Sequence, residues 1–248
     1  ILNKDDKFFN FFSDQAVKKG VEVISFGLTN KANIFLQSAM KIKNQYKLKI
    51  SIDRKVFCFK TSLSTKNFIN NILACISILS VLNLDLNKIK KEFLKFKIPS
   101  GRGNIMLVKK FNKKFKFIDE SYNANPLSML SAIKNMNYYK RKNNSKKIVF
   151  LGDMLELGNK SQRLHKELSS IINKSDIDKV FVYGKYIKET FSSLSSSKKG
   201  RIFSNLKEAY EHFGKIVHNN DLLMVKGSNA TGLNHFSKSF KRGQINAL

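Results

Sequence analysis

The sequence predicts an α/β protein in two parts: a mixed sheet with antiparallel strands and helices, followed by a parallel α/β domain. Alternating apolar and polar residues between 33 and 59, many β-branched or aromatic, are typical of half-exposed antiparallel strands. From about residue 104, short apolar runs alternate with amphipathic helical patterns, which is typical of a parallel sheet covered on both faces. The breaker segment 98–103 separates the two patterns, so we expect domains 1–103 and 104–248.

The first domain is expected to begin with a strand end and a polar turn. A short amphipathic helix over 8–16, a buried strand over 21–26 and antiparallel strands over 47–52 and 55–60 follow. Two helices, from about 66 to 79 and from 86 to 96, complete it.

The second domain repeats a strand and a helix five times. Strands are predicted over 115–118, 147–151, 179–183, 201–203 and 222–225, and helices near 127–137, 161–173, 186–194, 205–217 and 230–241. Asn125 is expected to cap the first of these helices, with Pro126 at its first position. Because the carboxyl ends of parallel strands meet at one edge, the turns 119–125, 152–153, 184–185 and 226–228 should converge there. Their carboxylates, lysine and helix amino termini predict a ligand site.

The composition of the chain is strongly basic, with a formal net charge of +28. The lysines occur in every segment without regular aromatic interleaving, which favours a general composition bias over a nucleic-acid surface. Cys58 and Cys75 lie in apolar surroundings without paired spacing and are expected to be buried free thiols. No apolar run is long enough to span a membrane, so a cytoplasmic protein is expected. A monomer without membrane or nucleic-acid partners is also expected. The start at Ile1 suggests a piece of a longer protein.

Three motifs carry a resemblance to a known family. They are the strings DESYNANP at 119–126, LGDMLELG at 151–158 and VKGS at 225–228. They resemble the carboxyl-terminal domain of the Mur ligases, and 3–6, 67–70 and 101–102 resemble the later half of that family's central ATPase domain. The resemblance therefore implies the end of a central ATP-binding domain followed by a Rossmann-like ligase domain.

The resemblance implies an ATP-dependent ligase of peptidoglycan precursor synthesis, and hence of cell-wall formation, cell shape and division. The motifs are most similar to those of the members that add D-alanyl-D-alanine to UDP-N-acetylmuramoyl-tripeptide. In such enzymes ATP converts a carboxylate into an acyl phosphate, which the amine then attacks. ATP and Mg2+ are the implied cofactors.

The resemblance also implies roles for individual residues. Asn67 and Asn70 would hydrogen-bond adenine, and Arg102 would act catalytically on the phosphates. Glu120 would accept from the ribose hydroxyls, with Tyr122 and Asn123 lining the same pocket. The residues that would hold the dipeptide are Asp153, Lys226, Gly227 and Ser228.

Plainer interpretations stay open for several of these residues. Asn67 or Asn70 could cap a helix, Arg102 could be a solvated linker cation, and Asp153 could cap the next loop. His165 is expected to be a surface or core-edge residue rather than an acid or base.

The sequence lacks the GxxxxGK[ST] loop that would cradle phosphates and supply a Mg2+ ligand, so the fragment alone is expected to be inactive. Two other functions remain open. One is another ligase of the superfamily, such as a folylpolyglutamate synthase. The other is a phospho-acceptor receiver domain built on Asp119, Glu120, Asp153 and Lys226.

Overall fold

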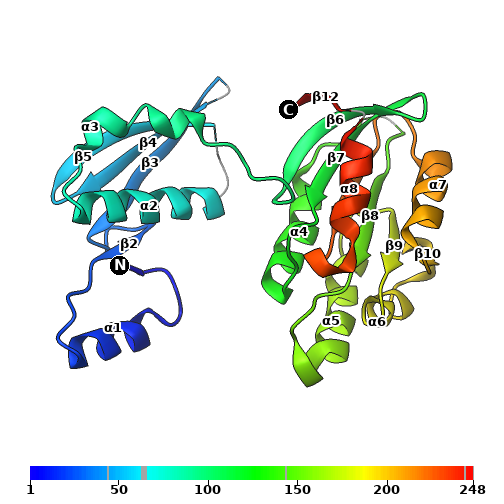
Figure 1. Cartoon of the computed structure of the whole chain (residues 1–248), viewed down its shortest axis with the longest axis horizontal. Coiled ribbons are helices and arrows are strands. Elements are labelled where there is room, and N and C mark those ends of the chain that lie inside the picture. The colour runs from blue at the N-terminus through cyan, green and yellow to red at the C-terminus, as the bar shows by residue number, and fades with distance from the viewer. Residues whose placement is uncertain (44, 63–65, 143, 243, 248) are drawn as a thin grey trace. The chain divides into compact units, whose positions relative to one another are not determined.

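The computed structural model describes residues 1–248 except 44, 63–65, 143, 243 and 248, and it leaves out the side chains of 66, 67 and 244–247. The chain forms two compact units, residues 1–97 and 98–248 (Figure 1). The expected boundary after Gly103 falls slightly later than this division. Segment 98–103 is counted with the second unit, where the Gly103 N–H donates to the Asp119 carbonyl over 2.8 Å.

The first unit is a five-stranded sheet in the order β1-β2-β3-β4-β5. Its strands are β1 (Leu2–Asn3), β2 (Ser25–Gly27), β3 (Ile34–Ile42), β4 (Gln45–Ile52) and β5 (Lys55–Thr61). The first three strands run parallel, and β4 is antiparallel to both β3 and β5, so the expected mixed sheet is confirmed. Helix α2 (Lys66–Val81) supplies Ile69, Ile72, Leu73 and Ile76 to the core of this unit.

Three sequence predictions in this unit need correction. The two cysteines expected to be buried are free thiols, but Cys58 is exposed and Cys75 is half-buried. The strand expected over 21–26 is confined to Ser25–Gly27. The helix expected over 86–96 divides into α3 (Leu86–Ile89) and a 3-10 turn, Glu92–Lys95. The tighter turn directs Phe93 into the core against Phe59, with ring centroids 5.1 Å apart. The helix near the amino terminus is α1 (Phe9–Lys18).

The second unit is a seven-stranded sheet in the order β10-β9-β8-β11-β7-β6-β12. Its strands are β6 (Asn104–Lys110), β7 (Lys113–Glu120), β8 (Lys147–Gly152), β9 (Lys179–Tyr183), β10 (Lys199–Phe203), β11 (Leu222–Lys226) and β12 (Gln244–Ala247). The strands from β7 to β11 are the five parallel strands that the sequence predicts.

The prediction of a purely parallel sheet was wrong at one edge. There β6 runs antiparallel to both of its neighbours, β7 and β12. Strands β6 and β7 form a hairpin through Phe111 and Asn112, whose φ angles are +54° and +56°. Such a two-residue turn with both φ angles positive matches the twist of the strands. Phenylalanine is an unusual residue in this turn, so the sequence signal was weak.

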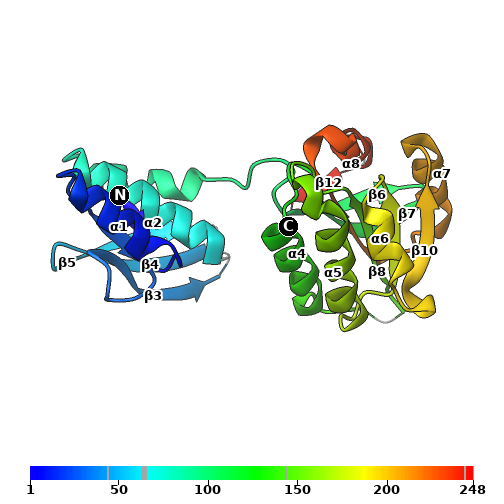
Figure 2. The same ribbon diagram turned by 90° about the horizontal axis from the view of Figure 1, so that it is seen from below.

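Five helices cover the two faces of this sheet (Figure 2). They are α4 (Pro126–Tyr138), α5 (Ser161–Asn173), α6 (Ile187–Ser192), α7 (Leu206–Ile216) and α8 (Leu233–Lys241). The first three pack over one face through an aliphatic core, and α7 and α8 pack over the other through a phenylalanine-rich core. The central strands β8 and β11 are thus buried on both faces, and their ends are where they can present polar groups to a ligand. Within the described chain, none of the helices combines the length and the apolar character that crossing a bilayer requires.

Candidate active site

The polar edge of the second unit is built around a pair of opposite charges, Glu120 and Lys226. The two residues are register partners at the carboxyl ends of β7 and β11, with Lys226 Nζ 3.4 Å from Glu120 Oε2. Lys226 is only 1% exposed, and its ammonium also donates to the Asn123 carbonyl over 3.1 Å. Burial raises the pKa of Glu120 and lowers the pKa of Lys226, while the attraction between them opposes both shifts. The lysine therefore fixes both the carboxylate and the loop that follows it.

Asp119 points to the other face of the sheet, because successive strand residues alternate in direction. Its carboxylate is 1% exposed, pairs with Lys241 of α8 and accepts a 2.6 Å hydrogen bond from Ser121 Oγ. Burial alone would raise the pKa of Asp119. The hydrogen bonds from Lys241 and Ser121 and the positive charge of Lys241 outweigh this effect and leave the pKa lowered. The two neighbouring acids thus occupy separate ion pairs.

Arg102 lies on a turn that is held against the loop after β7. The Tyr122 N–H donates to the Gly101 carbonyl over 3.1 Å, and the Arg102 guanidinium lies 4.5 Å from the centre of the Tyr122 ring. Gly101 has φ +79°, and a side chain there would come within 2.8 Å of the tyrosine. Gly103 has φ +87°, and its Cβ would lie 2.7 Å from Glu120 Oε1. The two glycines therefore let Arg102 reach the same strand end as Glu120.

The start of α4 forms as the sequence predicts. Asn125 Oδ1 accepts from the Ser128 N–H over 2.8 Å, Ser128 Oγ accepts from the Asn125 N–H over 3.0 Å, and Pro126 occupies the first turn. This reciprocal cap fixes the loop containing Tyr122 and Asn123 between a buried strand and a rigid helix start.

Asp153 lies just after β8, and its carboxylate caps the start of α6, the helix that follows β9. Its Oδ1 accepts from the Tyr186 and Ile187 amides at 3.0 and 2.7 Å, and its Oδ2 accepts from the Lys185 amide at 2.8 Å. Gly184 is needed beside it, because a Cβ there would lie 2.5 Å from the carboxylate. The plainer interpretation, a loop cap, thus describes its contacts, and its role in holding the dipeptide stays a prediction.

The turn after β11 joins three strand ends. Ser228 Oγ donates to the Ala124 carbonyl over 3.3 Å and accepts from the Leu155 N–H over 3.0 Å, and the Ser228 N–H donates to the Asp153 carbonyl. Gly227 approaches Gly152 closely enough that a Cβ would lie 3.1 Å from its Cα. The expected convergence of the turns after β7, β8 and β11 is therefore present in the structure.

The sequence placed one residue of this region wrongly and gave no signal for another. His165 is completely buried, with Nδ1 2.6 Å from the Ser161 carbonyl and Nε2 accepting from the Met154 N–H over 2.9 Å. It is a core residue that fixes the loop after β8, more deeply placed than expected. Lys241 was missed because a lysine in the last turn of a helix is common in a chain this basic.

The two asparagines expected to hold adenine lie in the first unit. Asn70 is in α2, and its Oδ1 is buried without a hydrogen-bond partner among the described residues. A buried oxygen without a hydrogen-bond donor is energetically costly. Asn67 belongs to the same helix, but its side chain lies outside the described residues.

The receiver alternative needs its acids and lysine in one cluster, which the structure does not provide. Asp119 pairs with Lys241, Glu120 with Lys226, and Asp153 with backbone amides. The described residues also contain no group of three or more His, Cys, Asp or Glu side chains placed to hold a metal ion. The geometry therefore does not favour a phospho-acceptor site.

Comparison with known families assigns both units. Residues 1–79 match the Mur ligase middle domain, and residues 104–229 match the Mur ligase glutamate ligase domain. The chain belongs to the Mur ligase family.

Among curated Mur ligases, the chain is 30% identical over 94% of its length to UDP-N-acetylmuramoyl-tripeptide--D-alanyl-D-alanine ligase of Buchnera aphidicola subsp. Baizongia pistaciae, covering 48% of that protein. It is 29% identical over 85% of its length to the ligase of the same name from Rickettsia prowazekii, covering 45% of it. The chain thus spans about half the length of the curated relatives it matches.

Solved Mur ligases share this fold. MurF from Acinetobacter baumannii superposes with a TM-score of 0.77 at 20% identity, over 97% of this chain and 51% of that one. A MurF ligase from Thermotoga maritima in complex with ADP gives a TM-score of 0.70 at 20% identity, over 95% and 52%. A folylpolyglutamate synthase from Thermotoga maritima also matches, with a TM-score of 0.62, so fold alone does not separate these activities.

Proposed function

We propose that this chain is the later half of an ATP-dependent ligase that joins D-alanyl-D-alanine to UDP-N-acetylmuramoyl-tripeptide in peptidoglycan precursor synthesis. The observation that carries the proposal is the DESYNANP loop, held by Lys226, Asn125 and the Gly101-Arg102-Gly103 turn at one strand end. The relatives that carry this ligase name match the chain over most of its length.

The reaction requires an activated carboxylate. Transfer of the γ-phosphoryl group of ATP to the terminal carboxylate of the tripeptide would give an acyl phosphate and ADP. The amine of D-alanyl-D-alanine would then attack the carbonyl carbon, and the C–O bond to phosphate would break, releasing inorganic phosphate and one proton. Fixed cations stabilise the charge that develops on phosphoryl and carbonyl oxygens.

Separate roles in binding the adenosine and phosphate parts of ATP are proposed for residues of each unit. The unsatisfied Asn70 Oδ1 would accept from the adenine amino group. Glu120 Oε1 has no hydrogen-bond partner among the described residues and would accept from ribose hydroxyls, beside Tyr122 and Asn123. The exposed guanidinium of Arg102 would bind phosphate oxygens with its planar fork. We assign no step to Mg2+, because the GK[ST] loop that would supply its ligand does not occur in these 248 residues.

The dipeptide would bind at the turn of Gly227 and Ser228 beside Asp153. In the structure Asp153, Lys226 and Ser228 use their polar groups within the chain, so their proposed part is to hold this edge rigid for the incoming carboxylate. We place the reaction in the cytoplasm, with the enzyme acting as a monomer.

Phosphate release tests the proposal. Residues 1–248 alone should release no phosphate from ATP with both substrates present. The same chain joined to an amino-terminal half that carries a GK[ST] loop should release phosphate only when D-alanyl-D-alanine is supplied. Turnover with glutamate instead would favour a folylpolyglutamate synthase.

Nucleotide binding separates the site from the reaction. The test is a calorimetric titration of the joined protein with ADP. Arg102→Ala and Asn70→Ala should each weaken binding about tenfold, which corresponds to a loss of about 1.4 kcal/mol of binding free energy. An exposed control, Lys188→Gln, should leave binding unchanged. Unchanged ADP affinity in both site variants would contradict the assignments.

A further inference from the structure

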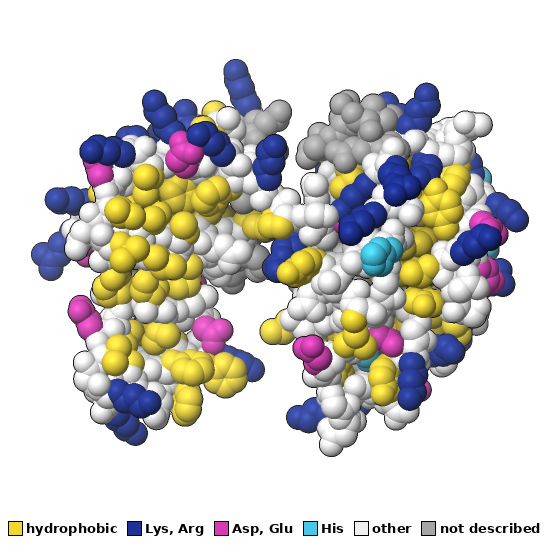
Figure 3. All heavy atoms as spheres, in the orientation of Figure 1, with side chains coloured by type: hydrophobic (Ala, Val, Ile, Leu, Met, Phe, Trp, Pro, Cys, Tyr) yellow, Lys and Arg dark blue, Asp and Glu magenta, His cyan; other side chains and the backbone are white. Residues whose placement is uncertain are grey.

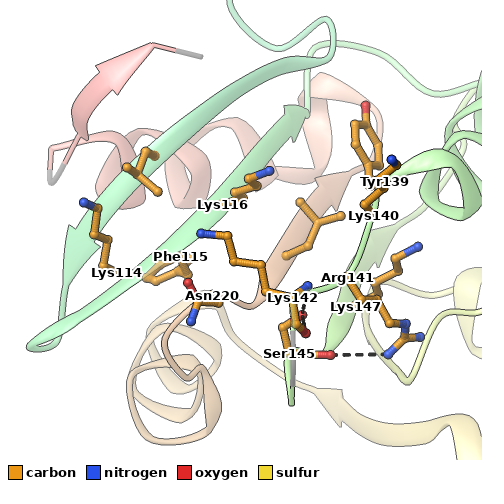
Figure 4. A pocket seen from close by; sticks show the side chains of 12 residues that line it. Lys114, Phe115, Lys116, Tyr139, Lys140, Arg141, Lys142, Ser145, Lys147 and Asn220 are labelled. Atoms are coloured by element: carbon orange, nitrogen blue, oxygen red, sulfur yellow. Dashed lines mark hydrogen bonds between the residues drawn. The ribbon is translucent and has the colours of Figure 1, made fainter.

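The second unit has a basic hollow at the amino-terminal edge of its sheet, opposite to the edge of Glu120. The hollow has a volume of about 200 Å³ and lies beside the first residues of β7, β8 and β11 and the segment after α4 (Figure 4). Its lining residues are Leu107, Lys114, Phe115, Lys116, Tyr139, Lys140, Arg141, Lys142, Ser145, Lys147, Asn220 and Leu222. Six of these are cations and none is a carboxylate.

The hollow follows from the lengths of the elements around it. Helix α4 has 13 residues and is about 20 Å long, whereas β7 has 8 residues and is about 26 Å long. The helix therefore ends before the strand edge does. A row of register partners across four strands, Leu107, Lys116, Leu222 and Lys147, is left as the floor.

Two of the six cations are already neutralised. Arg141 pairs with Asp178 over 2.7 Å, and Lys147, buried to 2% exposure, pairs with Asp176 and donates to the Met136 carbonyl over 2.6 Å. Asp221, the other nearby acid, accepts from the Lys146 and His218 amides. Among the described residues, these carboxylates thus pair with Arg141 and Lys147 or accept backbone amides, and none of them pairs with the other four cations.

The remaining four cations are Lys114, Lys116, Lys140 and Lys142. Lys114 and Lys116 stand two apart on β7, so they share one face of the strand, and the other two come from the segment after α4. Figure 4 shows the four side chains arranged around the hollow. Among the described residues, none of their ammonium groups has an ion pair or a hydrogen bond. Like charges gathered round one hollow repel each other, and a bound anion would remove this cost.

We propose that this hollow is a second binding site, for a compact anion with two or more charges of the phosphate type. Its size suits a diphosphate or triphosphate group, which Lys114, Lys116 and Lys142 would contact through their ammonium groups. Arg141, Lys147 and the buried Ser145 shape the wall without contributing free charge. Lysines elsewhere follow the general composition: Figure 3 shows Lys and Arg side chains spread over both units on the face in view. The hollow differs because six cations and no carboxylate line it.

Binding of inorganic pyrophosphate to residues 1–248 tests the site, measured by calorimetry at fixed ionic strength. The variant Lys116→Gln/Lys142→Gln should weaken binding at least tenfold. The matched control, Lys166→Gln/Lys188→Gln, removes the same charge from exposed helix positions of the same unit and should change binding less than twofold. A second variant, Lys114→Gln/Lys140→Gln, alters exposed residues only and guards against misfolding of the first; it should also weaken binding.

Further arms identify the anion and its location. Tripolyphosphate should compete with pyrophosphate for the site that depends on Lys116 and Lys142. The proposal is overturned if pyrophosphate does not bind, or if the control variant loses as much affinity as the site variants. Tighter binding of duplex DNA with the same dependence on Lys116 and Lys142 would also overturn it, in favour of a nucleic-acid surface. None of these results depends on ligase activity.

Discussion

Glu120 and Lys226 face each other across neighbouring parallel strands, with 3.4 Å between the carboxylate and the ammonium. Since Lys226 is 1% exposed, its charge is held almost out of water and depends on that carboxylate and on the Asn123 carbonyl. A buried ion pair of this kind adds little net stability over an apolar pair, but breaking it is costly. Its use here is to fix the loop that carries Tyr122 and Asn123.

Glu120→Gln should destabilise the chain, because it leaves the Lys226 ammonium buried without a negative partner. We expect the free energy of unfolding to fall by about 3 kcal/mol, measured by urea titration. The double variant Glu120→Gln/Lys226→Met should lose less than the two single variants together, because it removes both charges. Strictly additive losses would show that the two groups do not interact.

The ionised Asp119 carboxylate should contribute to the free energy of unfolding in a way that depends on pH. The pKa of Asp119 in the folded protein is lowered below the ordinary value of 3.8, so the unfolded state binds the proton more tightly. The stabilising contribution of Asp119 is therefore present above pH 3.8. Asp119→Asn should therefore cost about 1–3 kcal/mol of unfolding free energy at pH 7. The difference from the wild type should shrink as pH falls below 3.8. Asp14→Asn, at an exposed position of α1, should show no comparable difference at either pH.

Asp153→Ala should destabilise the second unit, because three amides at the start of α6 lose their acceptor. We expect a loss of about 2–4 kcal/mol in thermal or urea unfolding. Asp85→Ala is a useful comparison, because Asp85 caps α3 with one hydrogen bond; it should cost about 1 kcal/mol. Equal losses in the two variants would argue against the triple acceptor.

His165 should be a neutral imidazole with its proton on Nδ1. Its Nε2 accepts from the Met154 N–H, so the donor to the Ser161 carbonyl must be Nδ1. Nitrogen NMR of the labelled chain should report this tautomer, and a proton on Nε2 would contradict the contact. His165→Ala should also cost about 2–4 kcal/mol, through the lost hydrogen bonds and the cavity left in the core.

The sequence predicted the five parallel strands and their turns because hydrophobic periodicity and turn residues are local signals. The cap of α4 was likewise readable from Asn125 and Pro126. The hairpin that adds β6 was not, since its turn uses Phe111 at a position that usually favours glycine or asparagine. The family itself followed from three short strings, and the matches to the middle and glutamate ligase domains confirm it.

The sequence by itself determined the fold class, the family and the edge of the sheet where polar residues gather. Only the tertiary structure decided which charges meet there: that Asp119 turns to Lys241 and Glu120 to Lys226, and that Asp153 serves the amides of α6. The physical reason is that pairing between residues far apart in the sequence, such as the 106 positions between Glu120 and Lys226, depends on strand order and register. In a chain with 46 lysines and arginines, no local pattern marks the one that a buried carboxylate will meet.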